Sequence, residues 1–154
     1  MDGTIDLRPP RPAELGAIAA LCFRSKAHWG YDADFMEQCR EILKLDPRLV
    51  AAGLAQIATI RDQLCGVVEV SAVRKRAELE LIFVDPAWMN HGVGRLLYDW
   101  AKVTAEAQGC TELHILSDPN ARGFYEQQGA KFLRWAASDA IAGRMLPRLV
   151  HDLT

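Results

Sequence analysis

The chain has 154 residues, half of them hydrophobic and a quarter charged, and its formal net charge is −2. This length and composition are typical of one globular domain, which we place over residues 1–154. The near-neutral charge argues against a nucleic-acid partner bound through net positive charge, and against a polybasic membrane anchor. We therefore expect neither nucleic acid nor a membrane among the partners.

The cysteine pattern and the N-terminus bear on the compartment. Cys22, Cys39, Cys65 and Cys110 form no CxxC pair, and no histidine–cysteine cluster has zinc spacing, so we expect reduced core thiols and no metal site. The N-terminus shows no basic segment followed by an apolar one. The longest charge-free apolar stretch, 49–60, is shorter than the about 20 residues that a membrane helix needs. These features predict a cytoplasmic protein.

The first half of the chain predicts two helices between strands. A strand at 4–8 stops at a run of prolines, and apolar residues at helical spacing predict a helix from 13 to about 25. An aromatic loop, 28–31, precedes a second helix, which an aspartate caps at 32 or 34. Its predicted buried stripe is Phe35, Cys39, Ile42 and Leu43.

Three strands are predicted next, at 55–60, 64–73 and 78–84, the first two joined as a hairpin. Side chains alternate across a strand. The third strand should therefore place Leu79, Leu81 and Phe83 on one face. Its other face should carry Glu78, Glu80, Ile82 and Val84.

The second half alternates helices and strands. We predict a helix at 93–107, a strand at 112–117, a helix at 121–128 and strands at 131–137 and 145–152. The inner face of the first helix is predicted to be Val93, Leu96, Leu97, Trp100, Val103, Thr104 and Ala107. The hairpin favours antiparallel pairing, and the strand–helix–strand unit from 78 to 117 favours one parallel pair. The fold class is α+β, with a single central, mostly antiparallel mixed sheet flanked by helices.

The segment before the helix at 93 is the one that suggests chemistry. Gly92 and Gly94 let backbone amides approach a ligand closely, and the unpaired N–H groups of the helix start favour an anion such as phosphate. Arg95 adds a positive charge. The spacing is neither a P-loop nor GxGxxG, since Leu97 stands where a third glycine would be. A tight turn that binds nothing is the alternative.

In this context the sequence resembles the GNAT superfamily of acetyl-CoA-dependent N-acyltransferases. The matching segments are 81–88 (LIFVDPAW), 92–97 (GVGRLL), 120–121 (NA) and 124–132 (FYEQQGAKF). One departure falls on Met89, where the family usually has glutamine or arginine. The resemblance implies acetyl-CoA as acetyl donor, no metal, and a parallel strand pair that splays apart.

The resemblance also implies how the donor is held. Backbone amides from 90 to 95 would bind the pyrophosphate, the strand backbone at 82–84 would pair with the pantetheine arm, and Asn120 would bond the pantetheine or its own turn. The donor residues implied are Ile82, Phe83, Val84, Asn90, His91, Gly92, Val93, Gly94, Arg95 and Asn120.

Two kinds of catalytic group are candidates. Tyr125 would protonate the departing thiolate, with a buried core tyrosine as the alternative. Glu78 and Glu80 are candidate bases for the amine, because their strand would lie beside the acetyl group. The alternative for both is an exposed carboxylate paired with a cation of the 74–76 turn (Arg-Lys-Arg).

The acceptor side is expected at the aromatic loop. Trp29 and Tyr31 would shape a pocket for an apolar or cationic amine, and His28 would serve as a base. A packed loop without ligand contact is the alternative. The function expected is direct transfer of acetyl to a small-molecule or peptide amine in a ternary complex, with a homodimer possible. A non-catalytic acyl-CoA sensor is the other hypothesis.

Overall fold

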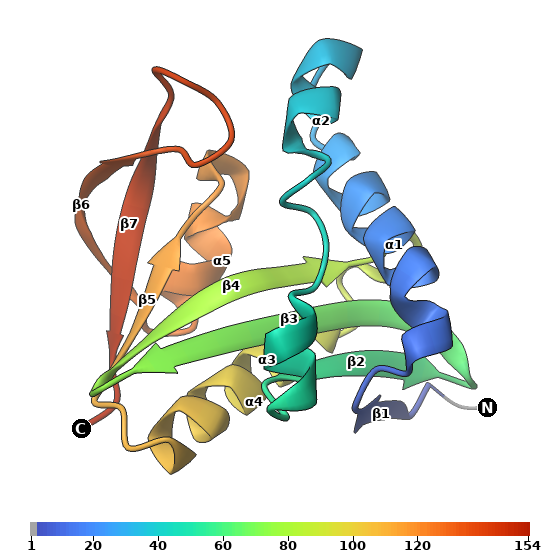
Figure 1. The fold of residues 1–154 in the computed structure, drawn as a ribbon, viewed down its shortest axis with the longest axis horizontal. Helices are drawn as coiled ribbons and strands as arrows, with labels where there is room; N and C mark the ends of the chain where they lie inside the picture. The colour runs from blue at the N-terminus through green and yellow to red at the C-terminus, as the bar shows by residue number, and fades with distance from the viewer. Residues whose placement is uncertain (1–2) are drawn as a thin grey trace.

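The computed structural model describes residues 3–154 as one seven-stranded sheet with helices on both faces (Figure 1). The strands are β1 (Ile5–Arg8), β2 (Ala55–Ile60), β3 (Gln63–Val73), β4 (Arg76–Val84), β5 (Glu112–Leu116), β6 (Lys131–Ala137) and β7 (Met145–Asp152). The α-helices are α1 (Leu15–Ala27), α2 (Ala33–Cys39), α3 (Pro47–Ala51), α4 (Val93–Ala107) and α5 (Arg122–Gln127). Short 3-10 turns are η1 (Pro12–Glu14), η2 (Pro86–Trp88) and η3 (Pro119–Ala121).

The strand order is β1-β2-β3-β4-β5-β7-β6, and every neighbouring pair is antiparallel except β4–β5. The predicted α+β fold with one parallel pair is therefore confirmed. The ladder between β4 and β5 ends where Glu78 pairs with His114. From residue 79 onward β4 has no partner on that side among the described residues, so the two strands splay apart.

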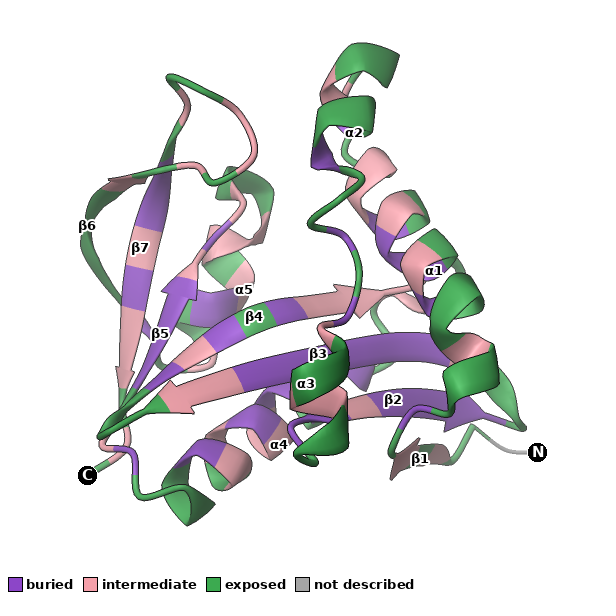
Figure 2. Ribbon diagram, viewed as in Figure 1, coloured by how far each residue is buried: buried purple, intermediate pink, exposed green. Residues whose placement is uncertain are grey.

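Two hydrophobic cores cover the two faces of the sheet. One packs α4 and α5 against the strands, with Leu97 and Tyr98 fully buried. The other packs α1 and α2, with Ile18 and Leu21 fully buried. Figure 2 shows burial concentrated in β2, β3 and β5, whereas the edge strand β6 is almost entirely exposed. All four cysteines are buried free thiols, as predicted.

The predicted alternation along β4 is wrong because the strand contains a β-bulge. Glu69 of β3 faces Leu81 and the next residue, Val70, faces Leu79, so Glu80 is an extra residue in β4. A bulge reverses the side-chain phase beyond it. Leu79 therefore packs in the α4 core, whereas Leu81 packs in the α1–α2 core.

The second predicted helix is shorter than expected. It ends at Cys39, and a separate helix, α3, follows Asp46. Leu43 and Leu45 are both buried between the two helices. Residues 40–44 form turns and a bend in place of a continued helix, and this path turns both Leu43 and Leu45 inward although they are two residues apart.

The predicted inner face of α4 is also partly wrong. Leu96 and Val103 are exposed, whereas Tyr98, Ala101 and Ala105 are buried. The face that meets the sheet is therefore rotated toward the alanines. Small side chains let a helix lie close to a sheet, and the pattern of large apolar residues alone does not register them.

No helix within residues 3–154 is long and apolar enough to cross a membrane. Within the same residues, no group of three or more histidine, cysteine, aspartate or glutamate side chains is placed to hold a metal ion.

Candidate functional site

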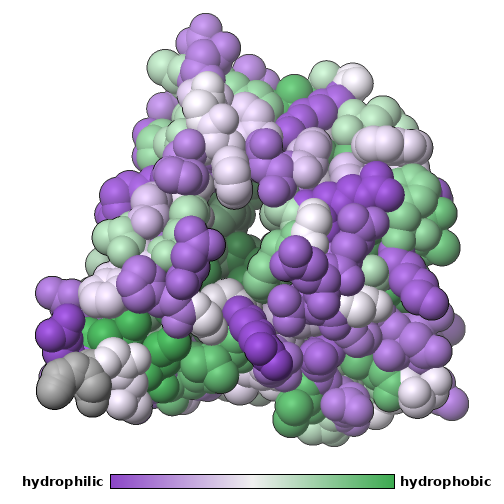
Figure 3. All heavy atoms as spheres, turned by 180° about the vertical axis from the view of Figure 1, so that it is seen from behind, coloured by the Kyte–Doolittle hydropathy of each residue, from purple (hydrophilic) through white to green (hydrophobic). Residues whose placement is uncertain are grey.

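A cleft of about 840 Å³ opens where β4 and β5 part, and the molecule is hollowed at its centre (Figure 3). Its walls come from β4, the loop before α4, the β5–α5 segment, the end of α1 and the β6–β7 loop. Within the described chain, all predicted site residues line this cleft except His91, Val93 and Tyr31. Those that line it are His28, Trp29, Glu78, Glu80, Ile82, Phe83, Val84, Asn90, Gly92, Gly94, Arg95, Asn120 and Tyr125.

The loop before α4 and the first turn of that helix carry a row of unpaired backbone N–H groups, and Asn90, Gly92, Gly94 and Arg95 of this row line the cleft. Asn90 and Gly92 adopt left-handed backbone angles, with φ of 65° and 86°, and Gly92 is the N-cap of α4. No acceptor within residues 3–154 takes the N–H groups of residues 90–95. The first N–H groups of a helix carry the positive end of its dipole. This segment can therefore bind a phosphate group.

Arg95 adds a cation to this row. The side chain belongs to the first turn of α4, lines the cleft and is exposed. It makes no ion pair with any residue from 3 to 154. The guanidinium of Arg95 is therefore available to pair with an anion bound at these N–H groups.

His91 shapes the loop instead of facing the cleft. Its Nδ1 donates to the carbonyl of Met89 at 2.8 Å, and its ring meets Trp88 edge to face at 5.5 Å. Asp85 fixes the preceding turn, because its carboxylate accepts from the Ala87 N–H at 3.0 Å. These contacts hold the loop without using the free N–H groups.

Two glycines let α4 approach its neighbours at this end. A Cβ on Gly66 of β3 would lie 2.8 Å from side-chain carbons of both Val93 and Leu97. A Cβ on Gly94 would lie 3.3 Å from the Phe124 ring of α5. Val93 thus serves packing with its side chain. The role of Gly66 was not predicted from the sequence.

The two glutamates of β4 have different surroundings. Both oxygens of Glu78 accept from Arg148 Nη1 at 3.1 Å, and Arg76 lies 3.5 Å away. The carboxylate of Glu80 is exposed and accepts from the Ser71 hydroxyl at 2.5 Å. Glu80 lies two residues beyond Glu78, the last residue that β4 pairs with β5, so it stands where the cleft opens.

Tyr125 is buried in α5 and borders the cleft. Burial raises the pKa of its hydroxyl far above the ordinary tyrosine value, and the charges of Tyr98 and Asp118 raise it further. No residue from 3 to 154 forms a hydrogen bond with this hydroxyl. Tyr125 therefore keeps its proton at neutral pH and has it free to donate.

The hydroxyl of Tyr31 belongs to a network that crosses the cleft wall, which we call the Asp118 network (Lys26, Tyr31, Asp118, Asn120 and Arg144). Tyr31 donates to Asp118 at 2.9 Å, and its oxygen accepts from Asn120 and Arg144 at 3.1 and 2.9 Å. Lys26 binds the same carboxylate at 2.6 Å. The Asn120 amide also donates to Asp118 of its own turn at 3.0 Å, and Tyr31 links the α1–α2 loop to the β6–β7 loop through Arg144.

Asp118, the centre of this network, was not predicted, although the sequence carries a signal for it. Asp46, Asp85 and Asp118 each precede a proline, and each accepts a hydrogen bond from the backbone N–H two residues later. An aspartate before proline is a frequent helix or turn start. The pattern locates three such turns, but it does not show that Asp118 also gathers a lysine and a tyrosine.

Comparisons with known proteins agree with this geometry. The family model for the acetyltransferase (GNAT) family matches residues 15–130. A search of curated proteins finds no match. Among solved structures, a GCN5-related N-acetyltransferase from Rhodopseudomonas palustris is 21% identical with a TM-score of 0.78, covering 99% of this chain and 98% of that one.

Two further structures have the same fold. The PaiA N-acetyltransferase of Thermoplasma acidophilum, solved with coenzyme A, is 15% identical with a TM-score of 0.78, covering 97% of this chain and 99% of that one. The ribosomal-protein-S18-alanine N-acetyltransferase of Escherichia coli is 17% identical with a TM-score of 0.66, covering 98% and 95%. The family match spans most of the sequence, and the chain therefore belongs to the GNAT family of acetyltransferases.

Proposed function

We propose that this protein, as one acetyltransferase domain, moves an acetyl group from acetyl-CoA to a primary amine of a small molecule or a peptide. Transfer is direct, in a ternary complex. The observation that carries the proposal is the row of unpaired N–H groups at 90–95, which lies at the head of the cleft beside the free edge of β4. Family membership supports the donor, since the T. acidophilum relative was solved with coenzyme A.

The residues present fit acetyl-CoA. The N–H groups of 90–95 and the Arg95 side chain would hold the pyrophosphate. Beyond the last β4–β5 pair, the backbone of Ile82, Phe83 and Val84 borders the cleft and would pair with the pantetheine amides. These N–H groups belong to the backbone. A methionine at position 89, where the family usually has a polar side chain, therefore leaves them in place.

The chemistry then falls to Tyr125 and Glu80. The departing sulfur would take a proton from the Tyr125 hydroxyl, which has no other hydrogen-bond partner in the described chain. We assign Glu80 ahead of Glu78 as the group that receives the proton of the amine. Protonation of Glu78 would break its ion pairs with Arg148 and Arg76, whereas Glu80 gives up one hydrogen bond from a hydroxyl.

The acceptor would enter past the end of α1. His28 and Trp29 line the cleft there, and the Trp29 side chain is exposed. A tryptophan ring face attracts cations, so it suits an ammonium group on its way in. The Tyr31 hydroxyl already forms three hydrogen bonds in the Asp118 network. Tyr31 would therefore shape the acceptor side by holding this network in place.

Release of the CoA thiol from acetyl-CoA in the presence of a panel of primary amines tests this function. We expect amine-dependent thiol release and an acetylated product of matching mass. Binding of acetyl-CoA with no release for any amine would favour the acyl-CoA sensor. Cys39 is the cysteine that lines the cleft. A Cys39→Ala variant that keeps its activity would exclude an acyl-cysteine route.

A further inference from the structure

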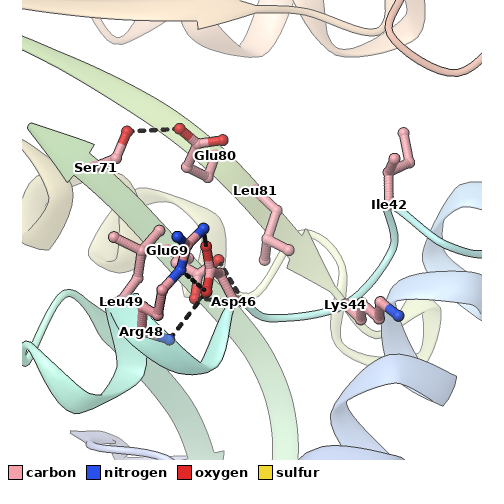
Figure 4. Close-up of a pocket in the computed structure, with 9 residues that line it drawn as sticks. All are labelled: Ile42, Lys44, Asp46, Arg48, Leu49, Glu69, Ser71, Glu80 and Leu81. Carbon is pink, nitrogen blue, oxygen red and sulfur yellow. Dashed lines mark hydrogen bonds and ion pairs between the residues drawn. The ribbon is translucent and has the colours of Figure 1, made fainter.

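A second, smaller pocket of about 520 Å³ lies against the cleft, between β3, β4 and the segment that leads into α3 (Figure 4). It shares Ile42, Glu80 and Leu81 with the cleft wall. Glu80, the extra residue of the β4 bulge, therefore lies at the boundary between the two spaces. A polar pocket of this size has room for several water molecules.

Glu69 of β3 lines this pocket, yet the residue is only 2% exposed. Both carboxylate oxygens accept from one donor, the backbone N–H of Asp46, at 3.1 and 3.0 Å. No lysine, arginine or histidine within residues 3–154 pairs with it. A buried carboxylate without a cation binds a proton more readily than an ordinary one.

The negative charges around Glu69 also favour its protonated form. Burial raises the pKa of Glu69 to about 7, the backbone N–H of Asp46 lowers it, and the charges of Asp46 and Glu80 raise it. On the α1 side the neighbour is the buried thiol of Cys22, whose own pKa burial raises to about 12. The cations of the pocket rim do not pair with Glu69: Arg48 bonds to Asp46, and Lys44 to Glu41.

Glu80 and Glu69 line the same pocket, and a serine lies beside them. Ser71 lies two residues after Glu69 on the same strand, and both side chains line the pocket. The Ser71 hydroxyl donates to Glu80 at 2.5 Å (Figure 4). Glu80 and the Ser71 hydroxyl thus form a hydrogen-bonded pair on the wall of the pocket that Glu69 also lines, and a pocket of this volume has room for water between the pair and the buried carboxylate.

We propose that Glu69 is the final acceptor of the proton that the amine loses before it attacks acetyl-CoA, and that Glu80 and pocket water pass this proton on. The inference rests on the proposed function. A proton acceptor is most effective when it titrates near the working pH. Burial raises the pKa of Glu69 to about 7, and the pocket that its carboxyl lines is the path by which the proton would leave to solvent. It acts through Glu80 and is a positioning residue for the proton, not one that touches the substrate.

The proton balance is simple. An ammonium group must lose two protons to become an amide nitrogen with one N–H. The first goes through Glu80 to Glu69 and then to solvent through the pocket. When the C–N bond has formed and the C–S bond breaks, the sulfur takes a proton from Tyr125. The second nitrogen proton then restores the Tyr125 hydroxyl. One proton in total reaches the solvent.

The test is the pH dependence of kcat/KM in wild type and Glu69→Gln. In wild type we expect a rise of about tenfold per pH unit that levels off near pH 7. Glu69→Gln should lose this rise, and kcat should fall by about 100-fold at pH 8. The control is Glu41→Gln, an exposed glutamate paired with Lys44, which should keep the rise. A rise near pH 7 that persists in Glu69→Gln would overturn the inference.

A second readout does not depend on activity. The side-chain carboxyl signal of Glu69 in the free protein should titrate near pH 7 by NMR, and in Glu80→Gln its midpoint should move lower. Glu80→Gln should also lose the rise in kcat/KM, which keeps the test decisive if Glu69→Gln does not fold. A Glu69 midpoint near 4 would overturn the inference while thiol release still supported acetyl transfer. Absence of thiol release from wild type would instead refute the proposed function, and the proton route with it.

Discussion

Replacement of Asp118 by alanine perturbs the network that joins three parts of the cleft wall. Its carboxylate lies 2.6 Å from Lys26, and both side chains are only 13% exposed. Removing one partner of a buried ion pair costs about 3–5 kcal/mol. Some solvent reaches this pair, so we expect the lower end, about 3 kcal/mol. For a chain of this size that lowers the melting temperature by about 6–12 °C. Urea unfolding at pH 7 measures the loss.

The pH dependence of this loss identifies its cause. Burial alone would raise the pKa of Asp118, but the hydrogen bond and charge of Lys26, with further donors, leave it lowered. A lowered pKa stabilises the fold above the unfolded value of about 4, and this contribution is lost as the pH falls through the folded value. The difference between wild type and Asp118→Ala should therefore hold from about pH 8 to 5 and shrink below about pH 4.

The matched control is Glu41→Ala, which removes an exposed ion pair with Lys44. Exposed pairs contribute little, so this variant should unfold almost as wild type does. If Asp118→Ala also unfolded as wild type does, or if its loss did not depend on pH, the reasoning would be refuted.

Three more substitutions test the packing and the chemistry of the site. Gly92→Val puts a branched side chain at φ 86° beside the N–H row and should weaken acetyl-CoA binding about tenfold or more by calorimetry; normal affinity in a folded variant would contradict the pyrophosphate position. Gly66→Ala places a Cβ 2.8 Å from Leu97 and Val93 and should cost about 1–3 kcal/mol in urea unfolding; no cost would mean that α4 yields freely. Tyr125→Phe should lower kcat about 100-fold with unchanged Kd for acetyl-CoA; unchanged kcat at saturation would exclude the acid role.

Local sequence patterns predicted most of the sheet but not its irregularity. The turn residues and the alternation on either side of them locate the β2–β3 hairpin and the β4–α4–β5 unit. The bulge at Glu80 depends on how β3 and β4 pair. The sequence of one strand alone does not determine its register with a neighbouring strand. The same irregularity places Glu80 between two pockets, so the missed feature matters for function.

The residues proposed to hold the donor were easier to locate from the sequence than the rest of the cleft wall. Their elements lie close together in the sequence, as a strand, a glycine loop and a helix start. Glu69 and Asp118 act through residues 23 and 92 positions away, Asp46 and Lys26 respectively. No local pattern brings such residues together. Tyr31 illustrates the same limit, because its aromatic character predicted a pocket wall while its hydroxyl serves a network.

The central claim is that the N–H groups of residues 90–95 hold the pyrophosphate of acetyl-CoA. Titration of the ¹⁵N-labelled protein with CoA, followed through its backbone amide resonances, tests this directly. We expect the largest shift changes at Asn90 to Arg95, with smaller ones along β4 from Ile82 to Val84. Saturable CoA binding that left the resonances of 90–95 in place would contradict the account.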